Sequence, residues 1–121
     1  MTIENLNAEY APNNGEPFRR CFVANFQSDN EYSDLTRFGE QHNVTMNFFK
    51  FESVENAMNY IRKHLAAATS DDYLVMSGNP FLCALAMKVW FEFFDQCNVL
   101  TWNSKDRKYI EHVVRDVDGK K

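Results

Sequence analysis

Cysteine is scarce in this sequence, and the few cysteines present follow no disulfide pattern. Cys21, Cys83 and Cys97 are odd in number and lack the spacing of a disulfide framework, which excludes a scaffold held together by disulfides. Cys21 lies in an apolar run and Cys83 in an apolar stretch that we expect to be helical. We therefore interpret the cysteines as small, reduced hydrophobic side chains of a cytoplasmic protein.

Long uncharged hydrophobic runs are also missing. The most apolar stretch, Phe81 to Phe94, contains Lys88 and Glu92, and no run of about 18 apolar residues occurs. The segment from Met1 to Gly15 is polar and does not resemble a secretory signal. We therefore expect neither a membrane partner nor export.

An excess of positive charge is lacking too. The formal net charge is -4 at pH 7 and the pI is about 5.3, which argues against general affinity for phosphate backbones. Lys105, Arg107 and Lys108 lie close to aromatic residues near the C-terminus, a mixture that can bind single strands. Asp106 and Glu111 dilute this positive charge, so we disfavour nucleic acid as a partner and interpret the segment as a solvated hairpin.

Apolar and aromatic residues are abundant. Hydrophobic residues make up 45% of the 121 residues, and eleven of them are Phe, which is enough for one core. We predict a flexible arm at 1–17 on the basis of its Asn and Pro content, one α/β domain at 18–116, and a polar tail at 117–121.

The hydrophobic pattern predicts alternating strands and helices. Ser53 and Asn79 are good N-caps for two of the helices, and the unbroken apolar run Tyr73 to Ser77 is typical of an interior strand. The predicted strands are 18–26, 44–51, 73–77, 99–102 and 108–114, and the predicted helices are 31–40, 54–68 and 79–96. The order β-α-β-α-β-α-β-β predicts an α/β fold: a short, mostly parallel, twisted sheet with helices packed on it and a C-terminal β-hairpin at an edge.

Three pieces of this order carry a family resemblance. They are FVANF followed by YSDLTRFGE, then DDYLVMSGNPFLCALAM, and then NVLTWNSKDRKY. Together they resemble a group of small proteins encoded by tailed bacteriophages, over roughly Phe18 to Val114. The resemblance implies a phage protein that acts in the host cytoplasm, and it implies no activity and no catalytic residue.

The turn Ser77-Gly78-Asn79-Pro80 is the strongest candidate for a ligand site. Ligands of open α/β sheets bind beyond the carboxyl ends of strands, and a helix N-terminus there offers free N–H groups. Ser77 and Asn79 can donate or accept hydrogen bonds, and Gly78 lets a ligand approach the backbone. A tight strand-to-helix turn capped by Asn79 needs the same residues, so both interpretations stand.

No catalytic or metal-binding constellation is visible. His42, His64 and His112 are scattered, and none has metal-ligand spacing with a cysteine or a carboxylate. We therefore predict no catalytic residue, no metal and no cofactor, and we favour a protein that is not an enzyme.

The third predicted helix is apolar around more than half of its circumference. One sheet face needs a narrower apolar arc, so part of the helix contacts something else. Either another part of the chain covers it or Met87, Trp90, Phe91 and Phe94 form a subunit interface, for which aromatic residues and Met are suited.

These observations favour a non-enzymatic phage accessory protein that acts by binding. The expected partners are further copies of the chain, in a homo-oligomer, and a host protein. The alternative is a small-molecule protein or enzyme that binds a nucleotide or a phosphate at the turn from Ser77 to Pro80.

Overall fold

The computed structural model describes residues 19–116. The expected arm at 1–17 and the expected tail at 117–121 lie outside the described residues. The strands are β1 (Arg20–Asn25), β2 (Glu40–Thr45), β3 (Tyr73–Val75), β4 (Gln96–Asn103) and β5 (Lys108–Arg115). The helices are the 3₁₀ helix η1 (Ser33–Arg37) and the α-helices α2 (Val54–Leu65) and α3 (Pro80–Phe93).

The strands form one mixed sheet in the order β2-β1-β3-β4-β5. β1 pairs in parallel with both β2 and β3, and β3 pairs in parallel with β4. β5 is antiparallel to β4 and lies at the edge. The predicted α/β fold, mostly parallel with a C-terminal hairpin, is confirmed, and so is the interior position of the strand that begins at Tyr73.

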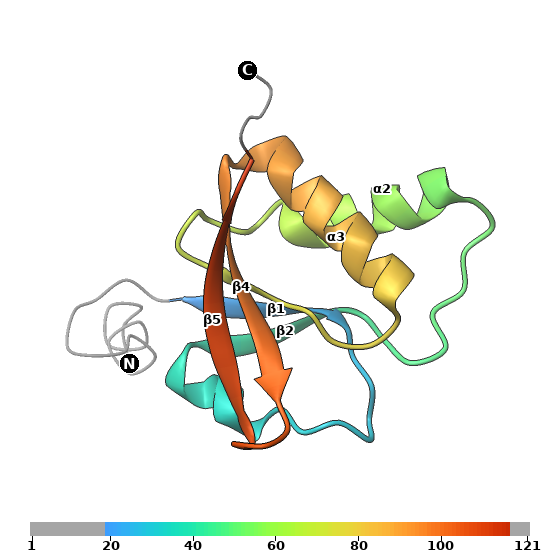
Figure 1. Ribbon diagram of the computed structural model, residues 1–121. Coiled ribbons are helices and arrows are strands. Elements are labelled where there is room, and N and C mark those ends of the chain that lie inside the picture. The colour runs from blue at the N-terminus through green and yellow to red at the C-terminus, as the bar shows by residue number, and fades with distance from the viewer. Residues whose placement is uncertain (1–18, 117–121) are drawn as a thin grey trace, which may run out of the picture.

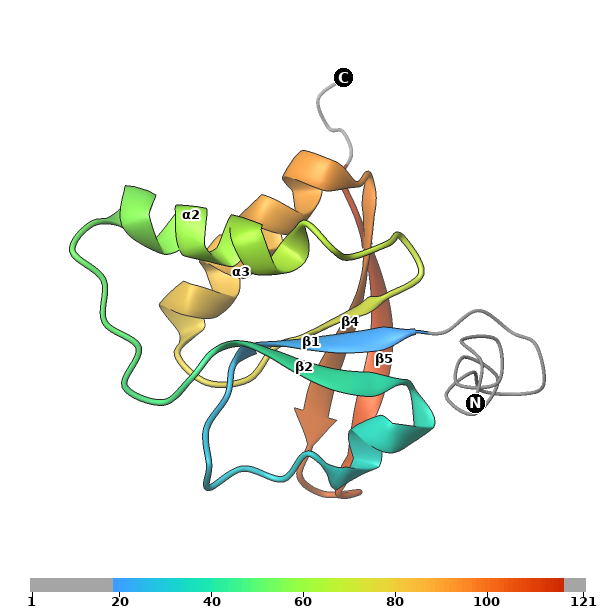
Figure 2. The same cartoon turned by 180° about the vertical axis from the view of Figure 1, so that it is seen from behind.

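Side chains that alternate along the strands fill two apolar layers. α2 and α3 lie on one face of the sheet and η1 lies on the other (Figures 1 and 2). On the first face Phe22 packs in the same cluster as Trp90, and on the second face Val23 packs in the same cluster as Leu35. Because neighbouring residues of a strand point to opposite faces, β1 contributes to both layers.

α2 begins at the cap that the sequence predicts. The Ser53 side-chain oxygen accepts a hydrogen bond from the Asn56 amide at 3.0 Å, which satisfies one of the free donors of the first helical turn. Ala57 and Ile61 are buried on the face that meets the sheet, so the predicted amphipathic stripe is the packing face.

The prediction for the second strand was wrong in position. The strand is Glu40–Thr45 rather than 44–51. An edge strand needs a partner on one side only, so a polar run can pair here, and β1 supplies that partner. Gly39 permits the close approach of the chain before β2 to the chain before β1, because a Cβ at this position would lie 2.5 Å from the Arg19 carbonyl oxygen. The phenylalanine-rich residues 48–51 follow the strand as a loop.

Other boundaries differ by smaller amounts. The helix expected at 31–40 is only the five-residue η1. α3 ends at Phe93 and β4 begins at Gln96, three residues before the predicted start at Val99. The strand continues toward α3 because the residues from Gln96 to Asn98 pair with the last residues of β5.

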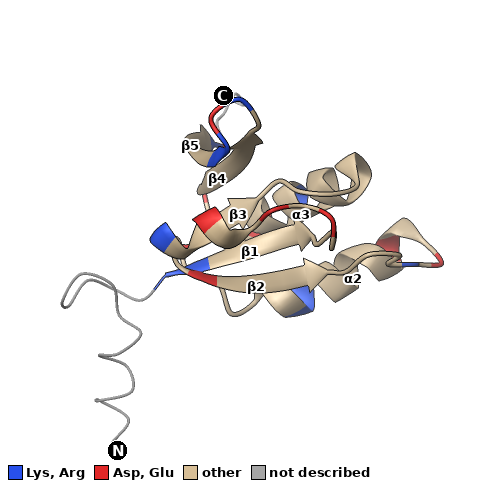
Figure 3. Ribbon diagram, turned by 90° about the horizontal axis from the view of Figure 1, so that it is seen from below, with Lys and Arg blue, Asp and Glu red and all other residues tan. Residues whose placement is uncertain are grey.

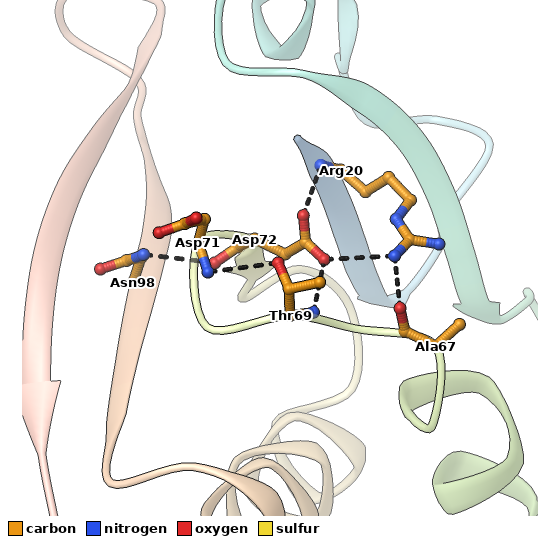
Figure 4. A network of polar contacts seen from close by, with 6 residues as sticks. All are labelled: Arg20, Ala67, Thr69, Asp71, Asp72 and Asn98. Atoms are coloured by element: carbon orange, nitrogen blue, oxygen red, sulfur yellow. Dashed lines mark hydrogen bonds and ion pairs between the residues drawn. The ribbon is translucent and has the colours of Figure 1, made fainter. Parts of the chain in front are cut away.

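Asp72 links the start of β1 to the loop that precedes β3 (Figure 4). Its side chain is only 1% exposed. The carboxylate accepts hydrogen bonds from the Arg20 amide at 2.9 Å and from the Thr69 amide at 2.8 Å. One of its oxygens also lies 3.5 Å from the Arg20 guanidinium. Buried polar groups need hydrogen-bond partners of this kind. The carboxylate therefore fixes the position of the first residue of β1 relative to the loop before β3.

We expect Asp72→Ala to lower the free energy of unfolding by about 3 kcal/mol, because it leaves the Arg20 and Thr69 backbone amides without their acceptor and takes the carboxylate away from the Arg20 guanidinium, which keeps only the Ala67 carbonyl. Asp71→Ala is the matched control. The Asp71 side chain is exposed, so this change should stay within about 0.5 kcal/mol. Urea denaturation followed by circular dichroism measures both. Equal stabilities for the two variants would contradict the proposed role of Asp72.

Candidate functional site

The side chain of Asn25 lies at the carboxyl end of β1 and hydrogen-bonds to three parts of the chain: the end of β2, the loop after β1 and the start of α3. Asn25 is 2% exposed. Its amide nitrogen donates to the Thr45 hydroxyl at 2.9 Å and to the Met46 carbonyl at 3.1 Å. Its amide oxygen accepts from the Asn79 backbone N–H at 2.9 Å and from the Gln27 side chain at 2.8 Å. The ends of β1 and β2 and the start of α3 are therefore held by one buried amide.

Gly78 is required beside that amide. Its φ of +91° lies in the left-handed region, which residues with a Cβ rarely adopt. A Cβ at this position would also lie 2.2 Å from the Asn25 carbonyl oxygen and 2.4 Å from the Asn25 side-chain oxygen. The backbone conformation and the nearby Asn25 therefore explain why position 78 is a glycine, whether or not a ligand binds there.

Asn79 directs its side chain to its own helix. The side-chain oxygen accepts from the Phe81 amide at 2.8 Å and from the Leu82 amide at 3.3 Å. Pro80 follows in the first turn, as the sequence predicts. The first free N–H groups of α3 are therefore already bonded within the chain, and they need no ligand to satisfy them.

A cavity of about 480 Å³ opens beyond the carboxyl ends of β1 and β3. Ser77 and Gly78 line it, as the ligand hypothesis expects, whereas Asn79 is not among the lining residues. The remaining walls come from the loop after β1 and from the hairpin β4–β5. The lining residues are Asp29, Asn30, Glu31, Met76, Ser77, Gly78, Trp102, Arg107 and Tyr109. We call this space the switch-point cavity.

The hairpin is fastened to the loop after β1 at this cavity. The Tyr109 hydroxyl donates to the Glu31 carbonyl at 2.8 Å, and burial raises the pKa of Tyr109, so the donor stays protonated. Arg107 pairs with the Glu31 carboxylate at 3.1 Å and has a φ of +56°, an uncommon backbone conformation for a residue with a side chain. Basic and acidic residues adjoin at this tip of the hairpin (Figure 3).

The polar groups of Ser77 are already engaged inside the protein. Its hydroxyl lies 2.6 Å from the Tyr32 hydroxyl, and the Asn30 amide donates to it at 3.3 Å. Its carbonyl accepts from the backbone N–H of Asn25 at 3.1 Å and from the Cys83 thiol at 3.3 Å. Ser77 therefore shapes the wall of the cavity more than it offers a free hydroxyl.

The four residues named for a subunit interface separate into two groups. Trp90 is fully buried. Its indole N–H donates to the Gln96 carbonyl at 2.9 Å, so Trp90 is a core residue with no surface left for a partner. Met87, Phe91 and Phe94 are half-buried at the margin of the same core. We call these three the α3 flank.

A more exposed apolar surface lies at the loop between β2 and α2, and the sequence analysis missed it. Phe48 is 88% exposed and has a φ of +61°. The Phe51 ring stacks on Phe81 of α3 with centroids 6.3 Å apart. We call this the aromatic surface, and its exposed members are Met46, Phe48, Phe51, Val54, Tyr60 and Phe81. The run FFKF, residues 48–51, lies just before the cap Ser53 and was the available signal for this surface. If these residues form a strand, too few residues remain before Ser53 for the loop that has to lead into α2.

Two histidines that are far apart in the sequence come together. His42 Nε2 lies 3.2 Å from His64 Nδ1. Burial, with a smaller effect of His42, lowers the pKa of His64 and so favours its neutral form. His112 is separate and lies 3.0 Å from the Thr101 hydroxyl. Among residues 19–116, no group of three metal-ligating side chains forms.

The chain matches the model of one protein family over residues 16–116, a family described as Phage Pam3 gp32-like protein. The match covers most of the chain. The protein belongs to the Phage Pam3 gp32-like family. The resemblance to proteins of tailed bacteriophages is confirmed, and the family description names no activity, substrate or partner.

No curated protein and no solved structure matches the chain. No helix in the described range 19–116 is long and apolar enough to span a membrane.

Gly78→Ala should lower the free energy of unfolding of this Pam3 gp32-like protein by at least about 2 kcal/mol. The new methyl group meets the Asn25 backbone in a conformation that alanine resists. Thermal or urea unfolding measures the change, with Ser77→Ala as the milder neighbour. An alanine variant as stable as the parent would refute the close approach of Gly78 to Asn25.

The thiols give a prediction that depends on protonation. Burial raises the pKa of Cys21 and of Cys97 to about 12, so at pH 8 on the order of one molecule in ten thousand carries the reactive thiolate at either position. Burial also raises the pKa of Cys83, which is only half-buried. Iodoacetamide at pH 8 should label Cys83 first, and all three after urea is added, as mass spectrometry can show. Labelling of Cys21 at the rate of Cys83 in the folded protein would contradict this.

Proposed function

We propose that this member of a phage protein family acts by binding, and that its first partner is a second copy of itself. The observation that carries the proposal is the aromatic surface. Monomeric proteins rarely leave several large apolar side chains exposed next to one another, and such surfaces mark sites of protein association. The host cytoplasm is the proposed compartment, because the three cysteines are free thiols.

Ring contacts join three members of the aromatic surface, Phe51, Tyr60 and Phe81. Phe49 links its two halves, with ring centroids 5.8 Å from Phe51 and 4.9 Å from Tyr60. Phe51 in turn reaches Phe81 on α3. The surface therefore extends over the loop and both helices of one face, and aromatic residues of this kind dominate the energetics of protein interfaces.

The charges at this surface favour a second copy as the partner. The same loop carries exposed Lys50 and exposed Glu52 on either side of Phe51. In a two-fold symmetric dimer one patch faces itself, so Lys50 of each subunit can approach Glu52 of the other. A loop that carries both signs complements its own copy.

The α3 flank is a weaker candidate for the same role. Phe91 and its neighbours are half-buried and already pack on the core, so covering them removes less apolar area from water. Phe48 has most of its ring exposed. We therefore assign the first interface to the aromatic surface.

Sedimentation velocity at micromolar concentration tests the proposal. The parent should sediment as a dimer, at twice the 14.2 kDa chain mass. Phe48→Glu should raise the dimer dissociation constant at least about tenfold, because it places a charge in an apolar contact. Val113→Glu is the matched control, since Val113 is 51% exposed on β5 and lies outside the aromatic surface.

Two outcomes would contradict this assignment. A parent protein that stays at 14.2 kDa would reject self-association. A dimer that Phe91→Glu dissociates and Phe48→Glu leaves intact would move the interface to the α3 flank. Circular dichroism of each variant shows that a change in mass does not come from unfolding.

A further inference from the structure

The switch-point cavity lies where a sheet of this topology offers space for a ligand. From β1 the chain moves to β2 on one side, and it later returns across β1 to β3 on the other side. The connections therefore diverge between β1 and β3, and they leave a crevice at the carboxyl ends of these two strands. The cavity, at about 480 Å³, occupies this position and falls within the range of about 300–1,000 Å³ that is typical of small-molecule sites.

Three side chains of the cavity have binding capacity that the fold does not use. Within residues 19–116, no hydrogen bond involves the Asp29 carboxylate or the Trp102 indole N–H, although the Trp102 ring packs edge-on against Tyr109 with centroids 5.0 Å apart. Arg107 donates one of the five N–H groups of its guanidinium to Glu31. The cavity thus combines an aromatic ring, one cation and two carboxylates, of which Glu31 is paired with Arg107 and Asp29 is not paired within residues 19–116.

We propose that the switch-point cavity binds a free mononucleotide. The planar base stacks on the half-buried ring of Trp102, the contact by which aromatic side chains hold bases. The phosphate accepts from Arg107, whose fork of donors suits phosphate oxygens. Asp29 accepts from a hydroxyl or amino group of the ligand.

The existing ion pair does not prevent this binding. The side chains of Arg107 and Glu31 are 69% and 53% exposed, and ion pairs as exposed as this one contribute little to stability. Arg107 can therefore turn toward a phosphate at small cost. The helix N-terminus does not serve as the phosphate site, because Asn79 already occupies its first donors.

Isothermal titration calorimetry of the full chain with AMP, adenosine and inorganic phosphate tests the proposal. AMP should bind with a Kd below about 1 mM, adenosine more weakly, and phosphate without detectable heat. Tryptophan fluorescence gives a second readout. AMP should quench Trp102, while the buried Trp90 remains unchanged.

Variants separate the three contacts. Trp102→Ala should weaken AMP at least about fivefold, the lower end for loss of a base stack, and Trp102→Phe should restore most of it. Arg107→Ala should reduce the affinity for AMP to that for adenosine and leave adenosine unchanged. Arg115→Ala is the matched control, because this arginine lies at the opposite end of β5, beside Gln96. Asp29 is exposed, so Asp29→Asn tests the contact of its carboxylate with the ligand without disturbing the core.

Several results would overturn the inference. One is the absence of heat and of quenching at about 1 mM AMP for a protein that circular dichroism shows to be folded. Another is AMP binding that survives both Trp102→Ala and Arg107→Ala. A short oligonucleotide that binds more tightly than AMP would assign the cavity to a nucleic-acid end instead. Phe48→Glu should leave AMP affinity unchanged, so failure of the proposed dimer and failure of the nucleotide site are distinguishable.

Discussion

The buried amide of Asn25 is the interaction on which the rest of this end of the molecule depends. A side-chain amide that is removed from water has to find partners for both its donor and its acceptor. Asn25 finds them in Thr45 at the end of β2, in Met46 just after it, and in the backbone N–H of Asn79 before α3. The aromatic surface begins at Met46 and the switch-point cavity lies against the turn at Gly78, so both proposed binding features inherit their position from this one residue.

Asp72 does at the amino ends of the strands what Asn25 does at the carboxyl ends. Each is a polar side chain almost without exposed surface, and each joins β1 to a segment far along the chain. Apolar packing alone tolerates small shifts of one strand along another, whereas hydrogen bonds at both ends of β1 do not. The register of β1 against β3, in which Phe22 lies beside Leu74, is therefore specified by polar groups as well as by the core.

Local signals in the sequence predicted the elements that depend on local physics. Ser53 and Asn79 cap helices because their side chains reach amides two or three residues ahead, and such caps are visible in the sequence. The strand at Tyr73 was recognisable from its unbroken apolar run. β2 was misplaced because an edge strand can be polar, and the residues after it are more apolar than the strand itself. The contacts of Asn25 with Thr45 and Asn79, of Asp72 with Arg20, and of His42 with His64 join residues 20 to 54 positions apart. No local pattern specifies such partners. Ser77 and Gly78 were candidate ligand residues from the sequence, but their place beside Trp102 and Arg107 in one cavity depends on the sheet order, which the sequence left open.

That sheet order also has a consequence for the path by which the chain folds. β4 and β5 are adjacent in the sequence and need only the turn at 104–107 to pair, whereas Cys21 of β1 pairs with Tyr73, which lies 52 positions later. Closing so long a loop costs conformational entropy before any contact repays it, so hairpins form early and parallel pairings form late. During synthesis β1 leaves the ribosome long before β3 exists. β1, an interior strand of the sheet, is thus made early and gains its pairing with β3 late. Its apolar side chains stay exposed until the second half of the chain arrives.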